Sequence, residues 1–259
     1  FYGPPWSELI VGGCAVAAWC VSAGLVRAGL RVVDFGRRVR GREPRFSPER
    51  RRVLGRAVAG VGAVGAGGVL VYGSTVEPAW LRVARHEVKI DGLPAGLRGL
   101  RLAVIADTHF GRAVPAARIE RAVWTALAIE PDAVVLLGDY IESDKAEFID
   151  ASIALLKPLA AKPCFAVLGN HDHWAGADHV RQALREMGAR LLDRDRVFLG
   201  AGGAVFDRYA DGCVCLAGVG DLWEDWSEGE VEAALRGVPE SCPAVLLSHN
   251  PDAAELPEM

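Results

Sequence analysis

Side chains that can bind metal ions follow four short apolar runs of this 259-residue chain. Each run is rich in Val, Leu, Ile and Ala, the composition of a strand that is buried on both faces. In an open α/β sheet the ligand site lies just beyond the carboxyl ends of such strands, so we expect the polar groups to gather at one edge. Carboxylate, imidazole and amide oxygen groups together suit a pair of divalent metal ions. The side chains concerned are Asp107, His109, Asp139, Asn170 and His249.

The spacing of these residues indicates how two ions would be shared. Asp107 and His109 are two positions apart just after a strand, so both reach one ion from an extended backbone. Asp139 follows a glycine that permits a tight turn, and its carboxylate can bridge two ions. Asn170 supplies an oxygen and His249 a nitrogen to the second ion. Two ions about 3.5–4 Å apart clamp a phosphoryl group and generate hydroxide at neutral pH. Taken alone, each motif also occurs in ordinary turns, so the prediction depends on their conjunction.

The elements that must position these side chains alternate between strands and helices from about residue 87. The early alternation predicts parallel strands, and the later short strands are spaced like hairpins, which predicts a mixed or second sheet. The expected strands are 87–90, 100–106, 133–137, 164–168, 189–192, 197–199, 204–206, 213–218 and 244–248. The expected helices are 114–129, 148–157, 178–187 and 228–235.

The charge is divided unequally along the chain. Residues 1–56 contain 11 Arg and four acidic residues, whereas the remainder contains 18 Lys and Arg against 29 acidic residues, a formal charge of −11. This balance argues against extended nucleic-acid binding, because a phosphate backbone requires a basic surface. The six cysteines form neither a disulfide framework nor a CxxC metal pattern, so we expect buried free thiols.

Two uncharged, mostly apolar segments, 9–26 and 57–76, approach the roughly 20 residues that cross a bilayer. The Arg-rich loop between them is expected to stay cytoplasmic, which puts the following chain on the outer side of a bacterial cell membrane. We therefore predict an N-terminal membrane segment over 1–82 and a globular domain over 83–259. Two alternatives remain for 57–76. The preceding Arg51-Arg52 resembles a twin-arginine export signal, or the segment is a buried Gly/Ala-rich helix of a soluble domain.

Four motifs of this chain resemble those of the calcineurin-like metallophosphoesterases, and most closely those of the bacterial membrane-associated branch. The resemblance covers about residues 88–252. It implies a mixed α/β fold, a four-layer αββα sandwich preceded by one or two transmembrane helices, with a dinuclear site. Mixed nitrogen and oxygen ligands admit Mn, Fe or Zn. The motifs are Asp107-Thr-His109, Gly138-Asp139-Tyr-Ile-Glu142, Gly169-Asn170-His171-Asp172 and Ser248-His249-Asn-Pro-Asp252.

By motif match, the resemblance assigns a role to each site residue. His171 matches the family histidine that contacts the phosphate and protonates the leaving oxygen. Glu142 stands where many members have an Asp that orients this histidine. The implied metal ligands are Asp107 and His109 for the first ion, Asp139 as the bridge, and Asn170 and His249 for the second ion.

The chain departs from the family pattern at two points. Glu142 is one methylene longer than the Asp that usually orients the histidine. The closing Gly-His-x-His motif, which supplies one ligand to each metal, does not occur before Met259. Since the chain also begins with Phe1 rather than Met, we expect a fragment of an active parent protein.

The function that the resemblance implies is hydrolysis of a phosphomonoester, phosphodiester or pyrophosphate by a metal-activated hydroxide. The substrate would be a small molecule or a lipid. An envelope lipid such as a UDP-diacylglucosamine-type precursor is one candidate, although an outward-facing domain fits a cytoplasmic nucleotide-lipid poorly. The alternative is a non-catalytic membrane protein that keeps the fold to bind a phosphorylated ligand or partner. The acidic charge of the domain argues against a DNA-processing nuclease. No sequence pattern indicates an oligomeric state.

Other polar residues have more ordinary interpretations. His173 and Trp174 either line the substrate cleft or pack where a helix begins. Asp221 and the two tryptophans that follow it suggest an exposed loop. The alternating charges of residues 193–196 suggest a solvated turn.

Overall fold

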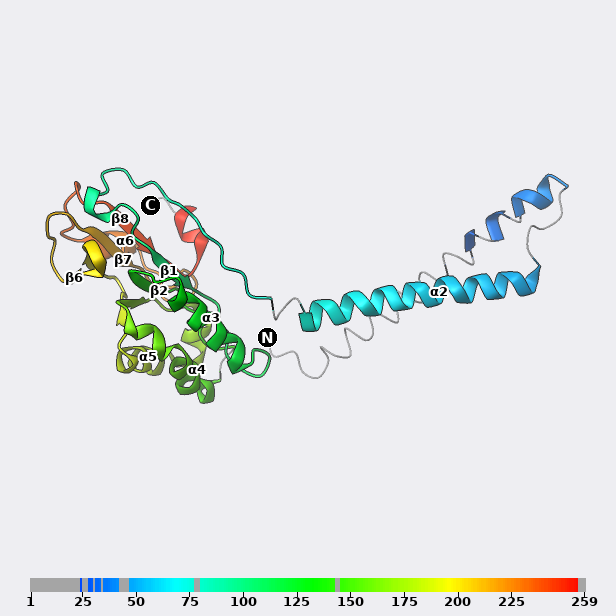
Figure 1. Cartoon of the computed structure of the whole chain (residues 1–259), viewed down its shortest axis with the longest axis horizontal. Helices are drawn as coiled ribbons and strands as arrows, with labels where there is room; N and C mark the ends of the chain where they lie inside the picture. Colours follow the sequence, from blue (N-terminus) through cyan, green and yellow to red (C-terminus); the bar gives the residue numbers. More distant parts are fainter. Residues whose placement is uncertain are drawn as a thin grey trace. The chain divides into compact units, whose positions relative to one another are not determined.

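The computed structural model describes residues 24, 28–29, 31–33, 35–41, 47–76, 80–142 and 145–255 (Figure 1). The chain divides into two compact units, Phe1–Ala84 and Arg85–Met259. The predicted apolar segment 9–26 lies outside the described residues apart from position 24, and so do residues 27, 30, 34 and 42–46 of the Arg-rich loop.

The first unit contains the long helix α2 (Pro48–Val71). It begins at Ser47, whose Oγ accepts the backbone N–H of Arg50 at 3.3 Å, as an N-cap does. The helical path continues to Val76, and the 25 residues from Arg52 to Val76 form a helix long and apolar enough to cross a membrane. Its side chains are almost all exposed. The predicted apolar segment 57–76 lies within this helix.

In the second unit, four parallel strands form one sheet in the order β1-β2-β3-β4. Figure 1 shows α3, α4 and α5 together on one side of it. This arrangement confirms the parallel strands expected from the strand–helix alternation. The elements are β1 (Leu102–Ile105), α3 (Ala116–Ala128), β2 (Ala133–Leu136), α4 (Ile149–Leu156), β3 (Cys164–Ala166), α5 (Asn170–Met187) and β4 (Arg190–Leu191).

A second, mixed sheet has the order β6-β5-β7-β8. The strand β5 pairs antiparallel with β6 and β7, whereas β7 and β8 are parallel. This confirms the second sheet predicted from the hairpin-like spacing. The elements are β5 (Asp195–Leu199), β6 (Val205–Phe206), β7 (Val214–Gly218), α6 (Glu230–Leu235) and β8 (Ala244–Leu247).

Three apolar clusters show that the second unit has four layers. In β2, Val134 and Leu136 belong to the cluster between the first sheet and the helices, whereas Ala133 and Val135 belong to the cluster between the two sheets. Alternate residues of one strand therefore point to opposite cores, as its continuous apolar sequence requires. The outer face of the second sheet packs against Ala234 of α6. The layers are helices, sheet, sheet and helix, which confirms the αββα sandwich.

Two elements differ from the prediction. The strand expected over 87–90 is absent, since these residues are mostly exposed and belong to neither sheet of the described chain. An isolated extended segment has no neighbour to pair its backbone groups, so periodicity alone does not make it a strand. Helix α5 begins at Asn170 instead of residue 178, because Gly176 (φ 128°) kinks it without ending it. The first turn of α5 therefore carries Asn170 and His171.

Candidate metal centre

The loop after β1 runs alongside the loop after β2. The backbone N–H of Asp107 donates to Gly138 O at 3.1 Å, and that of His109 donates to Asp139 O at 3.0 Å. Further along, the N–H of Phe110 donates to the carbonyl of residue 140 at 2.9 Å. These bonds extend the parallel pairing of the strands into the loops. They place Asp107 and His109 beside Asp139.

Three of the predicted ligands have a left-handed backbone. The φ angles are 53° at Asp107, 41° at His109 and 55° at Asp139. This conformation costs roughly 1–2 kcal/mol for each non-glycine residue. It persists because the paired loops fix the backbone on both sides. Such strain concentrates at functional sites, and these three residues account for most of the left-handed non-glycine positions in the described chain.

Asp139 lies at the centre of a cluster of carboxylates and imidazoles. Its Oδ2 is 3.4 Å from His109 Nε2 and 4.0 Å from His171 Nε2, and its Oδ1 is 3.5 Å from His249 Nε2. Among the described residues, two groups of candidate metal ligands share this one carboxylate. Within each group the ligand atoms lie within 4.8 Å of one another. The groups are His109, Asp139 and His171, and Asp107, Asp139 and His249.

This grouping differs in part from the predicted division of ligands. Asp107 is grouped with His249, although its Oδ1 also lies 3.5 Å from His109 Nε2. Its carboxylate therefore reaches toward both groups. His171, predicted to contact substrate, lies close enough to belong to one of the ligand groups.

Backbone carbonyl groups fix the tautomers of two histidines. His249 Nδ1 lies 2.8 Å from Leu137 O, and His171 Nδ1 lies 2.7 Å from Glu142 O. A carbonyl oxygen only accepts, so each Nδ1 carries the proton. In the neutral ring the lone pair is then on Nε2, the nitrogen that faces Asp139. This is the arrangement of a histidine prepared to bind a metal or exchange a proton.

Two glycines allow the strand ends to approach one another. Gly138 has φ 91°, and a β-carbon there would lie 2.3 Å from the backbone nitrogen of Gly169. A β-carbon on Gly169 would lie 2.3 Å from Asp139 Oδ1 and 2.9 Å from His249 Cε1. Side chains at either position would therefore force the site apart. Gly169 lies at the cluster, and the buried Asn170 follows it directly.

A fully buried carboxylate, Asp172, joins the loops that carry the site. Its Oδ2 accepts the backbone N–H groups of Asp139 (2.8 Å) and Gly169 (2.9 Å), and its Oδ1 accepts that of Tyr140 (2.9 Å). Burial raises the pKa of Asp172 to about 7. The hydrogen bonds from these N–H groups act in the opposite direction and lower the pKa. The sequence placed Asp172 in a motif but gave no sign of this role.

Replacing Asp172 with Asn is expected to destabilise the protein by about 2–3 kcal/mol. The amide retains one oxygen, so its NH₂ group faces at least one of the three backbone N–H groups and leaves it unsatisfied. Thermal unfolding should show a melting temperature lower by about 5–10 °C. The matched control is Asp178→Asn, on the exposed side of the same helix, where the melting temperature should stay within about 2 °C. Equal effects of the two substitutions would contradict this role.

The predicted orienting role of the Glu142 side chain is not seen. The partner of His171 Nδ1 is the backbone carbonyl of Glu142, while the Glu142 carboxylate accepts the N–H of Ala113 at 3.2 Å. The main-chain carbonyl of Glu142, and not its side chain, therefore contacts His171 Nδ1. Because a main-chain carbonyl makes the contact, the extra methylene of Glu142 does not affect it.

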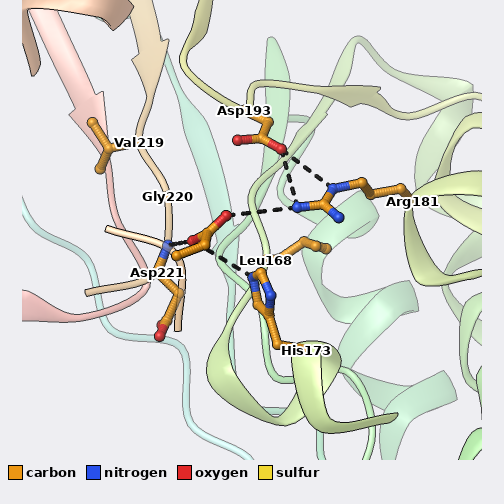
Figure 2. Close-up of a pocket in the computed structure, with 8 residues that line it drawn as sticks. Leu168, His173, Arg181, Asp193, Val219, Gly220 and Asp221 are labelled. Carbon is orange, nitrogen blue, oxygen red and sulfur yellow. Dashed lines mark hydrogen bonds and ion pairs between the residues drawn. The ribbon is translucent and has the colours of Figure 1, made fainter. Parts of the chain in front are cut away.

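Charged side chains of α5 and of the loops after β4 and β7 meet around a small pocket (Figure 2). Arg181 of α5 points toward Asp193, and their ion pair measures 3.2 Å. Asp225, in the loop after β7, lies 3.6 Å from Arg181 and 3.7 Å from His173 Nε2. Asp225 also accepts the N–H of Asp221 at 2.6 Å. These contacts fasten the loop after β7 to the helix that carries His171.

The exposed loop predicted after β7 is confirmed at Trp223, which is 65 % exposed, but not at Asp221. The solvated turn predicted over 193–196 is wrong. Asp221 is 1 % exposed, and its Oδ2 accepts from Asn250 Nδ2 at 2.9 Å. Burial raises its pKa. Residues 193–196 are not a solvated turn, because Arg194 is held by the buried Glu230 at 2.5 Å and by Asp193 at 2.6 Å. Asn250 lies 29 positions from Asp221 and Glu230 lies 36 positions from Arg194, so no local pattern could have indicated these two contacts.

Two further groups lie apart from the cluster. His179 is exposed and pairs with Asp150 at 2.8 Å on the surface. Four cysteines are buried and free, which confirms the predicted thiols: Cys164, Cys213, Cys215 and Cys242.

Comparisons with known proteins give the same family as the motifs. The family model for calcineurin-like phosphoesterases matches residues 100–255. "Transmembrane protein with metallophosphoesterase domain" of Danio rerio is 31 % identical over 193 residues, covering 71 % of this chain and 43 % of that protein. "Phosphodiesterase YaeI" of Escherichia coli K12 is 28 % identical over 214 residues, covering 80 % and 72 %. "UDP-2,3-diacylglucosamine pyrophosphatase LpxG" of Chlamydia trachomatis serovar D is 34 % identical over 104 residues, covering 40 % and 32 %. The chain spans less than half the length of the first and third of these relatives.

Proposed function

Because the chain belongs to the calcineurin-like phosphoesterase family of metal-dependent hydrolases, we propose that the cluster around Asp139 holds two divalent ions for phosphoester hydrolysis. The observation that carries the proposal is the position of Asp139, whose two oxygens face histidines of two ligand groups that share it. When bound, such ions lower the pKa of water to near neutrality and clamp phosphoryl oxygens. Mn, Fe and Zn all accept these nitrogen and oxygen ligands.

The donor groups of the cluster fit two such ions. We propose that Asp107 and His109 hold one ion, that Asn170 and His249 hold the other, and that Asp139 contacts both. The Nε2 lone pair of His249 is directed to the cluster by the Nδ1 bond to a carbonyl. Asp139 is almost fully buried, so its charge needs compensation by a partner such as a cation.

His171 would supply the proton for the leaving oxygen. Its Nδ1 proton is committed to Glu142 O, so the exchangeable proton is the one on Nε2, which faces the cluster. In the proposed reaction, that proton passes to the oxygen of the departing group as the bond to phosphorus breaks. The carbonyl fixes the ring orientation for this transfer.

We also propose that residues 1–82 attach the protein to a bacterial cell membrane and that 83–259 form the catalytic domain on its extracytoplasmic side. The exposed apolar helix Arg52–Val76 supports attachment, and the zebrafish relative is named a transmembrane protein. The substrate would be a phosphomonoester, phosphodiester or pyrophosphate, on a small molecule or a lipid-linked envelope compound. The name of the chlamydial relative supports a UDP-diacylglucosamine-type precursor as one candidate.

Removal of divalent metal is expected to abolish phosphodiester hydrolysis. The purified protein in detergent would be incubated with EDTA, desalted and assayed on bis-para-nitrophenyl phosphate. Release of nitrophenolate should fall by at least about a thousandfold, because the lost ions contribute several kcal/mol to the barrier. Addition of Mn²⁺, Fe²⁺ or Zn²⁺ should restore the rate, and metal analysis should find two ions per chain.

Two results would count against the proposal. Turnover that is unchanged after the metal has been removed would exclude a role for the cluster. Absence of turnover with all three metals demonstrably bound would favour the alternative, a membrane protein that keeps the fold only to bind a phosphorylated ligand.

A further inference from the structure

The ring of His171 lies between two other rings. His109 approaches it edge-on, with centroids 4.6 Å apart and planes at 76°. The second neighbour is Trp174, whose ring centroid lies 4.7 Å from that of His171, with the two planes tilted by 38°. His171 and Trp174 are three positions apart in the first turn of α5, before the kink at Gly176, so they share one face of that turn. The indole is therefore a neighbour of the predicted proton donor.

The orientation of Trp174 is restricted by the loop after β7. Its Nε1 donates to Glu224 Oε1 at 2.8 Å. The backbone N–H of Glu224 donates to the buried Asp221 carboxylate at 3.1 Å, and Asp225 next to it pairs with Arg181. The polar atom of the indole is therefore hydrogen-bonded to Glu224, in a loop that is itself held to α5 by Arg181.

The remaining surface of Trp174 is apolar and accessible. The residue is 48 % exposed although it is in contact with His171. The charged and hydrogen-bonding groups of the metal centre would bind the phosphate and give no preference for what is attached to it. A flat apolar surface beside the proton donor provides such a preference, because aromatic rings stack favourably on an indole.

We propose that Trp174 contacts the leaving group and selects substrates that carry an aromatic ring near the leaving oxygen. The inference rests on the proposed function, since it takes His171 as the group that meets this oxygen. Because the His171 and Trp174 rings are 4.7 Å apart, a substituent on an oxygen that meets His171 would lie beside the indole. An aromatic ring covers the indole face, whereas a methyl group leaves it in water.

Two phosphonates, one with an aromatic ring and one with a methyl group, test the proposal. Phenylphosphonate and methylphosphonate both present an anionic phosphonyl group to the metals. Their inhibition constants would be measured on the Mn²⁺-loaded full chain against bis-para-nitrophenyl phosphate, with dissociation constants from calorimetry as a readout independent of turnover. In the wild type, phenylphosphonate should bind about tenfold more tightly, the value of one stacked aromatic pair. In Trp174→Ala this ratio should fall to within about twofold, and Trp174→Phe should recover most of it.

Substrate kinetics give a second measure. For Trp174→Ala on bis-para-nitrophenyl phosphate, KM should rise about tenfold while kcat changes little, because stacking is equal in the ground and transition states. The matched control is Trp124→Ala, since Trp124 is 61 % exposed on α3 and makes none of the ring contacts of Trp174 in the described chain. In Trp124→Ala, the ratio of phenylphosphonate to methylphosphonate binding and the KM should both equal the wild-type values.

The failures are distinguishable. No turnover by the metal-loaded wild type would defeat the proposed function. Normal turnover with a phenyl to methyl ratio near one, or a ratio that Trp174→Ala leaves unchanged, would overturn the role of Trp174 alone. A fall in kcat that is equal for all substrates would assign Trp174 only to holding His171.

Discussion

An Asp139→Asn variant is expected to hydrolyse bis-para-nitrophenyl phosphate at least about a thousandfold more slowly than the wild type. Asp139 is the one side chain shared by both ligand groups of the described chain, so its loss affects both proposed ions. The amide has no negative charge, and only one of its two terminal atoms accepts a metal or hydrogen bond. A thousandfold corresponds to about 4 kcal/mol of barrier, within the several kcal/mol that metal ions contribute.

Metal analysis separates this effect from a general loss of structure. Bound metal should fall below one ion per chain, while the melting temperature of the metal-free protein should change little, because the main-chain contacts between the loops remain. The matched control is Asp150→Asn, which alters another carboxylate paired with a histidine, at 2.8 Å from His179 on the surface. That variant should retain full activity and both ions. An Asp139→Asn protein with two ions and normal turnover would contradict the proposed centre.

Replacing His171 with Gln should slow the reaction by about 10²–10⁴-fold when the leaving group is a poor one. The glutamine amide cannot deliver the proton that the imidazole would carry on Nε2. Nitrophenolate departs without protonation, so the loss on bis-para-nitrophenyl phosphate should be much smaller than the loss on diphenyl phosphate. This dependence on the leaving group is the mark of a general acid, and steady-state rates on the two diesters measure it.

The bound metal decides between the two interpretations of His171. The side chain is also near enough to Asp139 and His109 to be a ligand. If it is a proton donor, the Gln variant keeps two ions per chain. If it is a ligand, one ion is lost and both diesters are hydrolysed more slowly by a similar factor.

The sequence was informative where chemistry and local pattern coincide. Residues 134–139 are apolar and end in Gly-Asp, so both the buried strand and the carboxylate at its end follow from the same run. The same reasoning placed His109 near Asp139, because the parallel strands β1 and β2 end at one edge of a sheet. His249 follows β8 of the second sheet, so its approach to Asp139 depends on the packing of the two sheets and not on a shared sheet edge. The second sheet was foreseen from spacing alone.

The sequence was uninformative where partners are remote or belong to the main chain. Nothing near Asp172 indicates that it binds N–H groups more than 30 positions earlier, and nothing near Asp221 points to Asn250. The orienting of His171 by a carbonyl leaves no mark on side-chain identity. The left-handed backbone of Asp107 and Asp139 is likewise set by the neighbouring loop, although Asp tolerates this conformation better than most residues.

The loops that carry Asp107, His109 and Asp139 are held by main-chain bonds to each other and by the buried carboxylate of Asp172. We therefore expect the polypeptide to mature first and to acquire its proposed cations last. On this expectation, a cell short of transition metals accumulates a dormant apoprotein that is ready for reactivation, instead of losing the polypeptide to aggregation and proteolysis.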